Sequence, residues 1–213
     1  GAVEVMEHLI GAGFRRIAHA TFVRTDDANE GRRSGYLRAM RKAKLKPEER
    51  LLVIGASGAV GSAMVQLGKH MGAIVTGVTS TRNVELVHSL GADTVIDYNS
   101  ADFIKTGMSW DVIADTVAAS SFAKCLPVLN EQGRYLAIAG GLPDLLARPK
   151  GRKKSIGGPA AERPEDLAEV ARLAKADVLK PVIDRIFSFD EMQEAHAYVD
   201  TGRKRGSVVV TVG

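Results

Sequence analysis

Hydrophobic and polar positions alternate along the chain with two periods, which predicts strands separated by helices. Leu51–Ile54 is a short, continuous apolar run that ends at a glycine, as in a strand buried on both faces of a parallel sheet. Ala59–Met71 and Arg82–Leu90 have apolar residues at helical spacing, and Gly91 ends the second of these helices. Further strands are predicted at Ala73–Val78, Thr94–Ile96, Val112–Ala114 and Arg134–Ala139.

The alternation resumes after a loop predicted from Gly140 to Pro159, which is rich in Gly, Pro and Lys. The elements predicted there are a helix at Pro164–Lys175, a strand at Val182–Phe187, a helix at Asp190–Thr201 and a strand at Ser207–Val212. Strands that alternate with helices are typical of a parallel sheet covered on both faces. We therefore predict an α/β fold, a three-layer, doubly wound, mostly parallel sheet of the Rossmann type, over residues 47–213.

Residues 1–46 are predicted to add an α–β–α segment to this fold. The pattern favours a helix at Val3–Ile10, a strand at Arg16–Phe22 and a basic amphipathic helix at Glu30–Leu45. A piece this short cannot bury enough surface to fold alone, and its strand would keep an unpaired edge. We expect the segment to pack with the Rossmann unit as one domain, against an edge strand or the stretch Val182–Phe187.

A glycine-rich turn lies between the strand Leu51–Ile54 and the helix that follows it, which is the context that a dinucleotide-binding fingerprint requires. In the pattern Ala56-x-Gly58-x-x-Gly61, the small Ala56 allows a tight turn. Gly58 lets a pyrophosphate approach the backbone, and Gly61 lets the helix pack on the strand. A glycine-rich turn without a ligand is the alternative. The residues predicted to hold the pyrophosphate are Ala56, Ser57, Gly58, Ala59, Val60 and Gly61.

The end of the second strand favours NADP(H) over NAD(H). An NAD enzyme usually has an acidic residue there, which binds the ribose hydroxyls. Here Thr79, Ser80, Thr81 and Arg82 follow the strand, and no carboxylate occurs before Glu85. Hydroxyl and guanidinium groups suit a 2′-phosphate. The alternative for Arg82 is a solvated side chain in the first turn of its helix.

Composition narrows the function classes. The 213 residues are 45% hydrophobic and 25% charged, and they contain no apolar run of about 18 residues that could span a membrane. With no secretory leader and one cysteine, Cys125, we expect a cytoplasmic protein without a disulfide. The net charge of +4 favours solubility and an anionic ligand, and no nucleic-acid-binding module is visible.

The sequence contains no candidate residues for zinc-dependent, short-chain reductase or serine-nucleophile catalysis. One cysteine and five scattered histidines do not supply a zinc site, so we assign no metal ligand. The chain has no Tyr-x-x-x-Lys pair and no Gly-x-Ser-x-Gly nucleophile elbow, so we assign no catalytic residue. Cys125 lies in an apolar helix, where a buried, inert thiol is expected.

From Leu45 to Gly213 the chain resembles the medium-chain dehydrogenase/reductases, especially their zinc-free quinone oxidoreductase branch. The stretches that carry the resemblance are KLKPEERLLVIGASGAVGSAMVQLGK, VTSTRNVELVHSLGADTVIDY, WDVIADTV, GRYLAIAGG, and GGPAAERPEDL with LKPVIDRIFSFDEMQEAHAYVDTGRKRGSVVVTVG. The resemblance implies a six-stranded Rossmann sheet, bound NADPH and hydride transfer to quinones or conjugated enones and enals.

The resemblance also implies roles for individual residues. Ala56 to Gly61 would hold the pyrophosphate of the cofactor, and Ser80 and Arg82 would bind its 2′-phosphate. Tyr98 would lie near the adenosine. The residues implied on the nicotinamide side are Asp115, Thr116, Val117, Ala139 and Gly140.

The N-terminal part departs from this family, whose members begin with a catalytic domain. The stretches VMEHLIGAGFRRIAH and EGRRSGYLRAMRKAKL instead resemble the second lobe of LacI-type repressor effector domains, which share the periplasmic-binding-protein-like fold. We therefore infer an engineered chimera in which this piece replaces the catalytic domain. An unusual or truncated natural gene is the alternative.

Three functional hypotheses follow. The first is an NADP(H)-binding module of oxidoreductase ancestry with little or no reductase activity, because half of the active-site cleft is missing. The second is an active NADPH-dependent quinone or enone reductase, with a partner chain that completes the cleft. The third is a chimeric fold test without a ligand. The oligomeric state stays open, and a homodimer is compatible with the sequence.

Overall fold

The computed structural model describes Met40 and residues 43–158 and 164–212. The predicted α–β–α segment therefore lies outside the described residues, apart from its last few positions. Its helix Val3–Ile10 and strand Arg16–Phe22, and its packing as one domain with the Rossmann unit, stay predictions.

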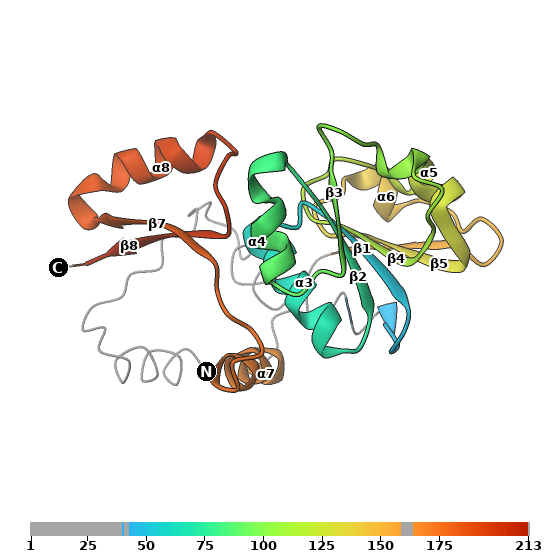
Figure 1. Cartoon of the computed structure of the whole chain (residues 1–213), viewed down its shortest axis with the longest axis horizontal. Coiled ribbons are helices and arrows are strands. Elements are labelled where there is room, and N and C mark those ends of the chain that lie inside the picture. The colour runs from blue at the N-terminus through green and yellow to red at the C-terminus, as the bar shows by residue number, and fades with distance from the viewer. Residues whose placement is uncertain (1–39, 41–42, 159–163, 213) are drawn as a thin grey trace.

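A six-stranded sheet forms the centre of the molecule (Figure 1). Its order is β3-β2-β1-β4-β5-β6, and the paired strands run parallel. The strands are β1 (Arg50–Ile54), β2 (Ile74–Thr79), β3 (Thr94–Asp97), β4 (Trp110–Asp115), β5 (Leu129–Ala137) and β6 (Lys154–Ile156). This order is that of a doubly wound Rossmann sheet, so the predicted fold class is confirmed.

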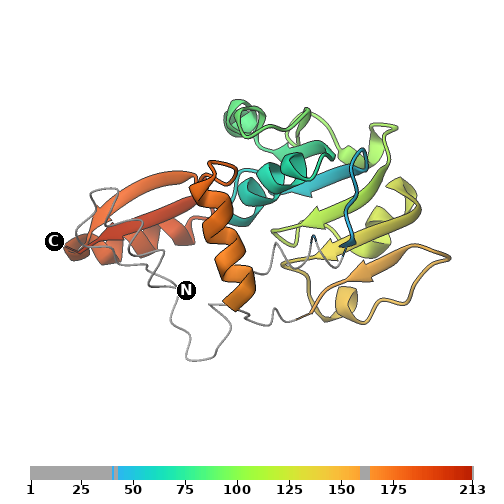
Figure 2. The same ribbon diagram turned by 90° about the horizontal axis from the view of Figure 1, so that it is seen from below.

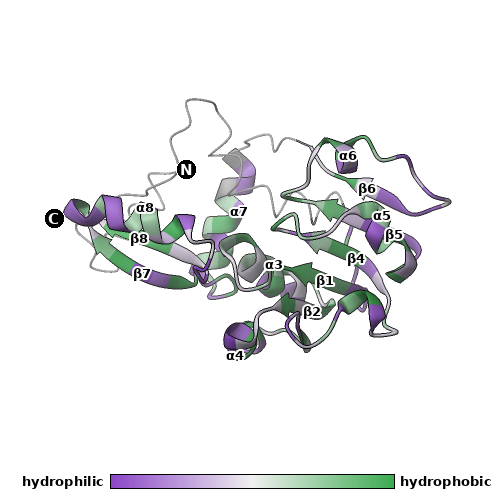
Figure 3. Ribbon diagram, turned by 90° about the horizontal axis from the view of Figure 1, so that it is seen from above, coloured by the Kyte–Doolittle hydropathy of each residue, from purple (hydrophilic) through white to green (hydrophobic). Residues whose placement is uncertain are grey.

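Helices cover both faces of this sheet. Alternate residues of β1 enter two different cores, Leu51 and Val53 on one face and Leu52 and Ile54 on the other. The helices α3 (Ala59–His70), α4 (Val84–Ser89) and α7 (Pro164–Lys175) contribute to the first core, and α5 (Phe122–Cys125) contributes to the second. The strand β1 after Arg50, and the middle of β4, are accordingly hydrophobic (Figure 3).

Short single-turn segments complete the covering layers. The helix α6 (Leu142–Leu145) follows β5, and 3-10 turns lie at Thr81–Asn83, Phe103–Lys105, Leu126–Val128 and Phe189–Glu191. Trp110, which opens β4, is fully buried and meets Phe103 edge to face, with ring centroids 6.2 Å apart.

The predicted loop from Gly140 to Pro159 is partly wrong, because it contains α6 and the edge strand β6. Both elements are too short to show a hydrophobic period. Lys154–Ile156 becomes a strand only by pairing with Arg134–Leu136 of β5, a contact that local composition does not encode.

The C-terminal strands form a second, smaller sheet. β7 (Ile183–Ser188) pairs in parallel with β8 (Ser207–Thr211), and α8 (Met192–Asp200) connects them. Figures 1 and 2 place this pair beside the six-stranded sheet, with α7 between the two. The sequence predicts that Arg16–Phe22 pairs with an edge strand or with Val182–Phe187. Within the described residues the partner of β7 is β8, and Arg16–Phe22 lies outside them.

Candidate cofactor site

The carboxyl ends of three central strands meet at one edge of the large sheet. Ile54, the last residue of β1, lies opposite Val78 of β2 and Asp115 of β4. Chain order reverses between β1 and β4, and open α/β sheets bind ligands at such a switch point. The predicted site residues of the turn, of β2 and of β4 are therefore brought together here.

The glycine-rich turn connects β1 to α3 at this edge. A Cβ atom built on Gly61 would lie 2.1 Å from the carbonyl oxygen of Gly55, so only glycine fits. At Gly58 the only atom within 4 Å of such a Cβ is the same oxygen, at 3.4 Å. Gly58 precedes the first residue of α3 and has no side chain to cap it. The first N–H groups of α3 therefore have no capping side chain, and such groups can bind an anion.

Hydroxyl groups support this turn from the end of β2. Thr79 is buried, and its Oγ1 donates a hydrogen bond to Ser57 Oγ at 2.9 Å. Asn83 Nδ2 donates to the same oxygen at 3.1 Å and to Ser80 Oγ at 3.2 Å. The predicted residue Thr79 thus contacts the turn. Asn83 is a site residue that sequence reasoning missed, because it looks like an ordinary helix start.

A pocket of about 350 Å³ lies beside the end of β2. The structure brings the predicted residues Ser80, Arg82 and Tyr98 together at this pocket, and Tyr98 is 61% exposed. Thr81, whose hydroxyl the sequence argument also named, lines it too, and so do Asn99 and Arg203, which sequence reasoning did not assign to the site. The Thr81 hydroxyl donates to Asp97 at 2.6 Å and thereby holds the pKa of that carboxyl below its ordinary value.

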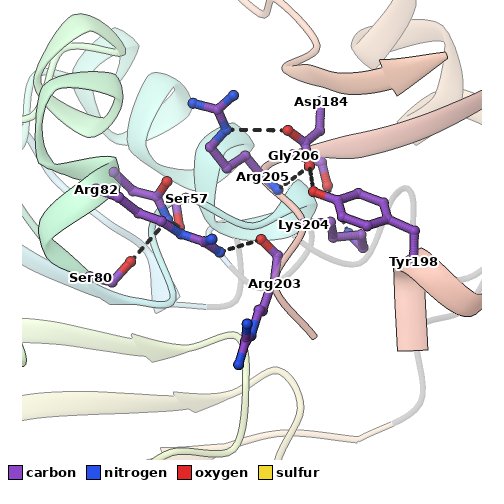
Figure 4. A network of polar contacts seen from close by, with 10 residues as sticks. Ser57, Ser80, Arg82, Asp184, Tyr198, Arg203, Lys204, Arg205 and Gly206 are labelled. Atoms are coloured by element: carbon purple, nitrogen blue, oxygen red, sulfur yellow. Dashed lines mark hydrogen bonds and ion pairs between the residues drawn. The ribbon is translucent and has the colours of Figure 1, made fainter. Parts of the chain in front are cut away.

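Arg82 and Arg203 both line this pocket. Arg82 Nη2 donates a hydrogen bond to the backbone carbonyl of Arg203 (Figure 4). The guanidinium group of Arg203 takes no part in this hydrogen bond. The two residues are 121 positions apart in the chain. The basic cluster at residues 203–205 is the sequence feature that could have drawn attention to Arg203. The sequence around this cluster does not indicate that Arg203 lies beside β2.

Residues 203–206, here called the C-terminal arm, lie across the glycine-rich turn. The Gly206 N–H donates to the Ser57 carbonyl at 2.7 Å, and Gly206 forms a parallel bridge with Gly58. Lys204 Nζ donates to the Gly206 carbonyl at 2.7 Å, and burial lowers the pKa of this lysine. The arm therefore connects the turn to the small sheet.

Asp184 of β7 holds the other side of the arm (Figure 4). Its carboxylate accepts hydrogen bonds from Arg205 N at 3.0 Å, Arg205 Nε at 3.2 Å and the Tyr198 hydroxyl at 2.6 Å. Burial alone would raise the pKa of Asp184, but the hydrogen bonds from Tyr198 and Arg205 hold it below its ordinary value. The hydrogen bond to Asp184 raises the pKa of the Tyr198 hydroxyl.

The loop after β4 forms the opposite side of the edge. Asp115 is fully buried, and its carboxylate accepts hydrogen bonds from three backbone N–H groups and one hydroxyl. The donors are Val117 N, Ala119 N, Ser120 N and the Tyr135 hydroxyl, at distances between 2.7 and 3.3 Å. Burial and the nearby carboxylate raise the pKa of Tyr135. Asp115 therefore shapes the loop from within.

The remaining predicted residues surround this loop. Thr116 Oγ1 donates to the Ile54 carbonyl at 2.8 Å, while Val117 is 53% exposed beside the turn. Ala139 N donates to the Asp115 carbonyl at 3.2 Å, and Gly140 follows at the end of β5. Val117 and Ala139 are thus the exposed residues of this group.

Cys125 is buried, as expected, and burial raises the pKa of its thiol to about 11. Across the described residues, no group of three His, Cys, Asp or Glu side chains could hold a metal ion. Within the part of the chain that the structure describes, no helix combines the length and apolar character needed to cross a membrane.

Comparison with known proteins gives consistent matches. A family model described as "Zinc-binding dehydrogenase" matches residues 90–210. The 2-methylene-furan-3-one reductase of Solanum lycopersicum is 33% identical over 175 residues, 80% of this chain and 42% of the relative. The NAD-dependent alcohol dehydrogenase of Sulfolobus acidocaldarius is 32% identical over 185 residues, 82% of this chain and 54% of the relative.

Among solved structures, the quinone oxidoreductase of Coxiella burnetii aligns with a TM-score of 0.76 at 27% identity. The alignment covers 85% of this chain and 58% of that protein. The chain thus spans about half of the length of the curated relatives it matches. The matches support the predicted resemblance to medium-chain quinone oxidoreductases. The LacI-type resemblance and the chimera find no support among them and stay predictions about residues outside the described part.

Proposed function

The chain belongs to the zinc-binding dehydrogenase family, and from this premise we propose that its Rossmann unit binds NADP(H). The observation that carries the proposal is the pocket at the end of β2, which Ser80, Arg82 and Arg203 line together. Two guanidinium groups and a hydroxyl form a donor set that suits a phosphate dianion and does not suit a bare ribose hydroxyl.

The glycine-rich turn fits the pyrophosphate of the same cofactor. Gly58 leaves the backbone open to a ligand, whereas Gly61 is in close contact with Gly55. An anion above Gly58 would meet the uncapped N-terminus of α3, which carries a partial positive charge. The distance between turn and pocket is bridged by the Ser57–Asn83–Ser80 hydrogen bonds.

We assign the two ends of the cofactor to opposite sides of the turn. Tyr98, with its exposed ring, would pack against the adenosine. Val117, Ala139 and Gly140 would lie beside the nicotinamide, on a loop that Asp115 holds in place. When bound, the cofactor would supply a hydride, and these residues of the chain would orient it.

By itself the chain is expected to bind the cofactor with little or no reductase activity. Where a partner chain completes the cleft, we propose reduction of quinones or of conjugated enones and enals. Support comes from the relatives, one of which is a 2-methylene-furan-3-one reductase and another a quinone oxidoreductase. A third relative is NAD-dependent, so the preference for NADPH rests on the pocket of this chain. Zinc does not fit the part of the chain that the structure describes, which offers no metal-ligand cluster, and we derive no step through it.

Adenosine 2′,5′-bisphosphate and 5′-AMP test the pocket by calorimetric titration, since they differ by the 2′-phosphate alone. We expect the bisphosphate to bind more tightly. Arg203→Ala should weaken its binding by about 10-fold or more, the scale of a hydrogen bond to a charged group, and leave 5′-AMP unchanged. Arg82→Ala should do the same but also release the Arg203 carbonyl.

Arg152→Ala is the matched control, because Arg152 is exposed and lies just before β6, the edge strand at the opposite end of the sheet from β2 and β3. Equal affinity for the two nucleotides, or equal losses for both in Arg203→Ala, would contradict the 2′-phosphate assignment. The cytoplasmic location and the homodimer stay predictions that these contacts do not address.

A further inference from the structure

Asn83 lies between the two phosphate-binding regions of the proposed site. It is 4% exposed, and its Nδ2 group reaches Ser57 in the turn and Ser80 in the pocket, at 3.1 and 3.2 Å. The amide therefore uses both of its N–H donors on serine oxygens. One of these serines belongs to the pyrophosphate region, and the other belongs to the 2′-phosphate region.

The two hydrogen bonds from Asn83 to the serines are unusual for a residue at this position. Asn83 is the N-cap residue of α4, where an asparagine side chain usually accepts a hydrogen bond from the helix. Here the side chain makes no capping bond, and its Oδ1 is buried without a hydrogen-bond partner among the described residues. The Asn83 side chain thus donates two hydrogen bonds to the serines through Nδ2, while its Oδ1 accepts none.

The opposite orientation of the amide would leave two buried N–H donors unsatisfied in place of one buried oxygen. An unmet buried polar group costs about 1–3 kcal/mol, so the orientation with Nδ2 toward the serines is favoured. That orientation determines what the serine hydroxyls can do. Ser57 Oγ accepts from Asn83 and from Thr79, so both of its lone pairs are occupied.

A hydroxyl whose lone pairs are occupied can act only as a donor toward a further partner. Ser57 is half-buried in the turn, next to the open face of Gly58. Ser80 is half-buried at the pocket, and its oxygen also accepts from Asn83. Both hydroxyl hydrogens are therefore left for an acceptor at the site, and phosphate oxygens are acceptors only.

We propose that Asn83 is a positioning residue that sets the Ser57 and Ser80 hydroxyls as hydrogen-bond donors to the pyrophosphate and to the 2′-phosphate, respectively. This inference rests on the proposed NADP(H) function. Asn83 would affect the binding of NADH and of NADPH through Ser57, because both cofactors have a pyrophosphate. It would affect the binding of NADPH alone through Ser80, because only NADPH has the 2′-phosphate. A residue that only maintained the fold would not divide its effect in this way.

Asn83→Ala tests the inference in calorimetric titrations of the 213-residue chain with NADH and NADPH. We expect NADH to bind about 5-fold more weakly and NADPH about 25-fold more weakly, since each misaligned hydroxyl is worth about one neutral hydrogen bond. In a Ser57→Ala background, Asn83→Ala should leave NADH affinity unchanged. In a Ser80→Ala background, it should weaken both cofactors by the same factor.

Asn130→Ala is the matched control, because Asn130 also donates through Nδ2, to Asp111, away from the site. It should leave both affinities unchanged. Asn83→Asp is a second variant that keeps the shape and the cap preference but can only accept, so it should turn both hydroxyls inward. We expect it to weaken both cofactors at least as much as Asn83→Ala.

The inference is overturned if Asn83→Ala and Asn83→Asp bind both cofactors like the wild type. It is also overturned if Asn83→Ala weakens NADH equally with and without Ser57. A wild-type chain that binds neither cofactor would overturn the proposed function and this inference together. Normal wild-type binding with unaffected variants would overturn this inference alone.

Discussion

Two glycines of the same turn differ in what a side chain would meet there. Gly58 has a φ of −76°, which a β-branched residue adopts readily, and a Cβ on it would have open space above. Gly61 sits against the Gly55 carbonyl, 2.1 Å from the place of a Cβ. We therefore assign the first glycine to the proposed ligand, whereas the second is needed for the packing of α3 on β1.

Gly58→Val is expected to abolish cofactor binding and largely spare the fold, because its side chain would occupy the space of the pyrophosphate. We expect NADPH affinity to fall by more than about 100-fold, while thermal unfolding shifts little. Calorimetric titration and circular dichroism measure the two effects. Normal NADPH binding by this variant would show that the turn is not the phosphate site.

Gly61→Ala is the complementary variant. The added methyl group overlaps a backbone oxygen, so the free energy of unfolding should fall by about 1–3 kcal/mol, as in other overpacked positions. Denaturant unfolding checks this value. If Gly61→Ala were as stable as the wild type, the close contact of α3 with the turn would be wrong.

Among the elements, the C-terminal arm has its own pH dependence, because Asp184 anchors it to β7. The pKa of Asp184 is held below its ordinary value in the folded protein. A depressed carboxyl pKa stabilises the fold fully above the unfolded value of about 3.9, and the stabilisation is lost as pH falls through the folded pKa.

We therefore expect the protection factor of the Arg205 amide to be constant above about pH 5 and to fall below about pH 4. Amide hydrogen exchange, corrected for the intrinsic rate at each pH, measures it. In Asp184→Asn the protection factor of the Arg205 amide should be lower at neutral pH. It should no longer fall as the pH is lowered below about 4. An unchanged protection factor in that variant would mean that Asp184 does not anchor the arm.

The elements that the sequence predicts correctly are those with a long period or a buried run. The strand Leu51–Ile54 and the helix starting at Ala59 are seen within one residue of their predicted ends. The strand β6 and the helix α6 were missed, because each is at most four residues long and forms through contacts with neighbouring elements. Short elements of this kind have no pattern of their own.

The same distinction applies to the site. Gly58, Gly61, Ser80 and Arg82 could be predicted because strand, turn and helix follow one another locally. Arg203 could not, because it reaches the pocket only when the arm folds back across the turn. Asn83 lies next to Arg82 in sequence, but its role depends on the orientation of a buried amide that no sequence pattern reveals.

For the molecule as a whole, the small sheet exposes apolar side chains. Ile183 is 50% exposed, Ile186 61% and Phe189 55%. The chain also spans only about half the length of the curated relatives it matches. Hydride transfer needs donor and acceptor in near-attack geometry, and we assign no described residue to hold an acceptor.

The 213-residue chain is accordingly expected to reduce quinones and conjugated enones at rates near background, even when it is saturated with NADPH. Steady-state oxidation of NADPH, followed with a simple quinone and with an enone, measures this. Saturation is verified by titration under the same conditions. A turnover on the order of 10 per second, typical of enzymes, would refute the expectation and favour an active reductase.

The central claim is that this chain is a site for NADP(H), and its most direct test is calorimetric titration of the wild-type chain with NADPH and with NADH. The account predicts one NADPH per chain, bound at least about 10-fold more tightly than NADH, because Arg82 and Arg203 meet the 2′-phosphate. Equal affinity for the two cofactors, tighter binding of NADH, or no heat of binding with either would contradict it.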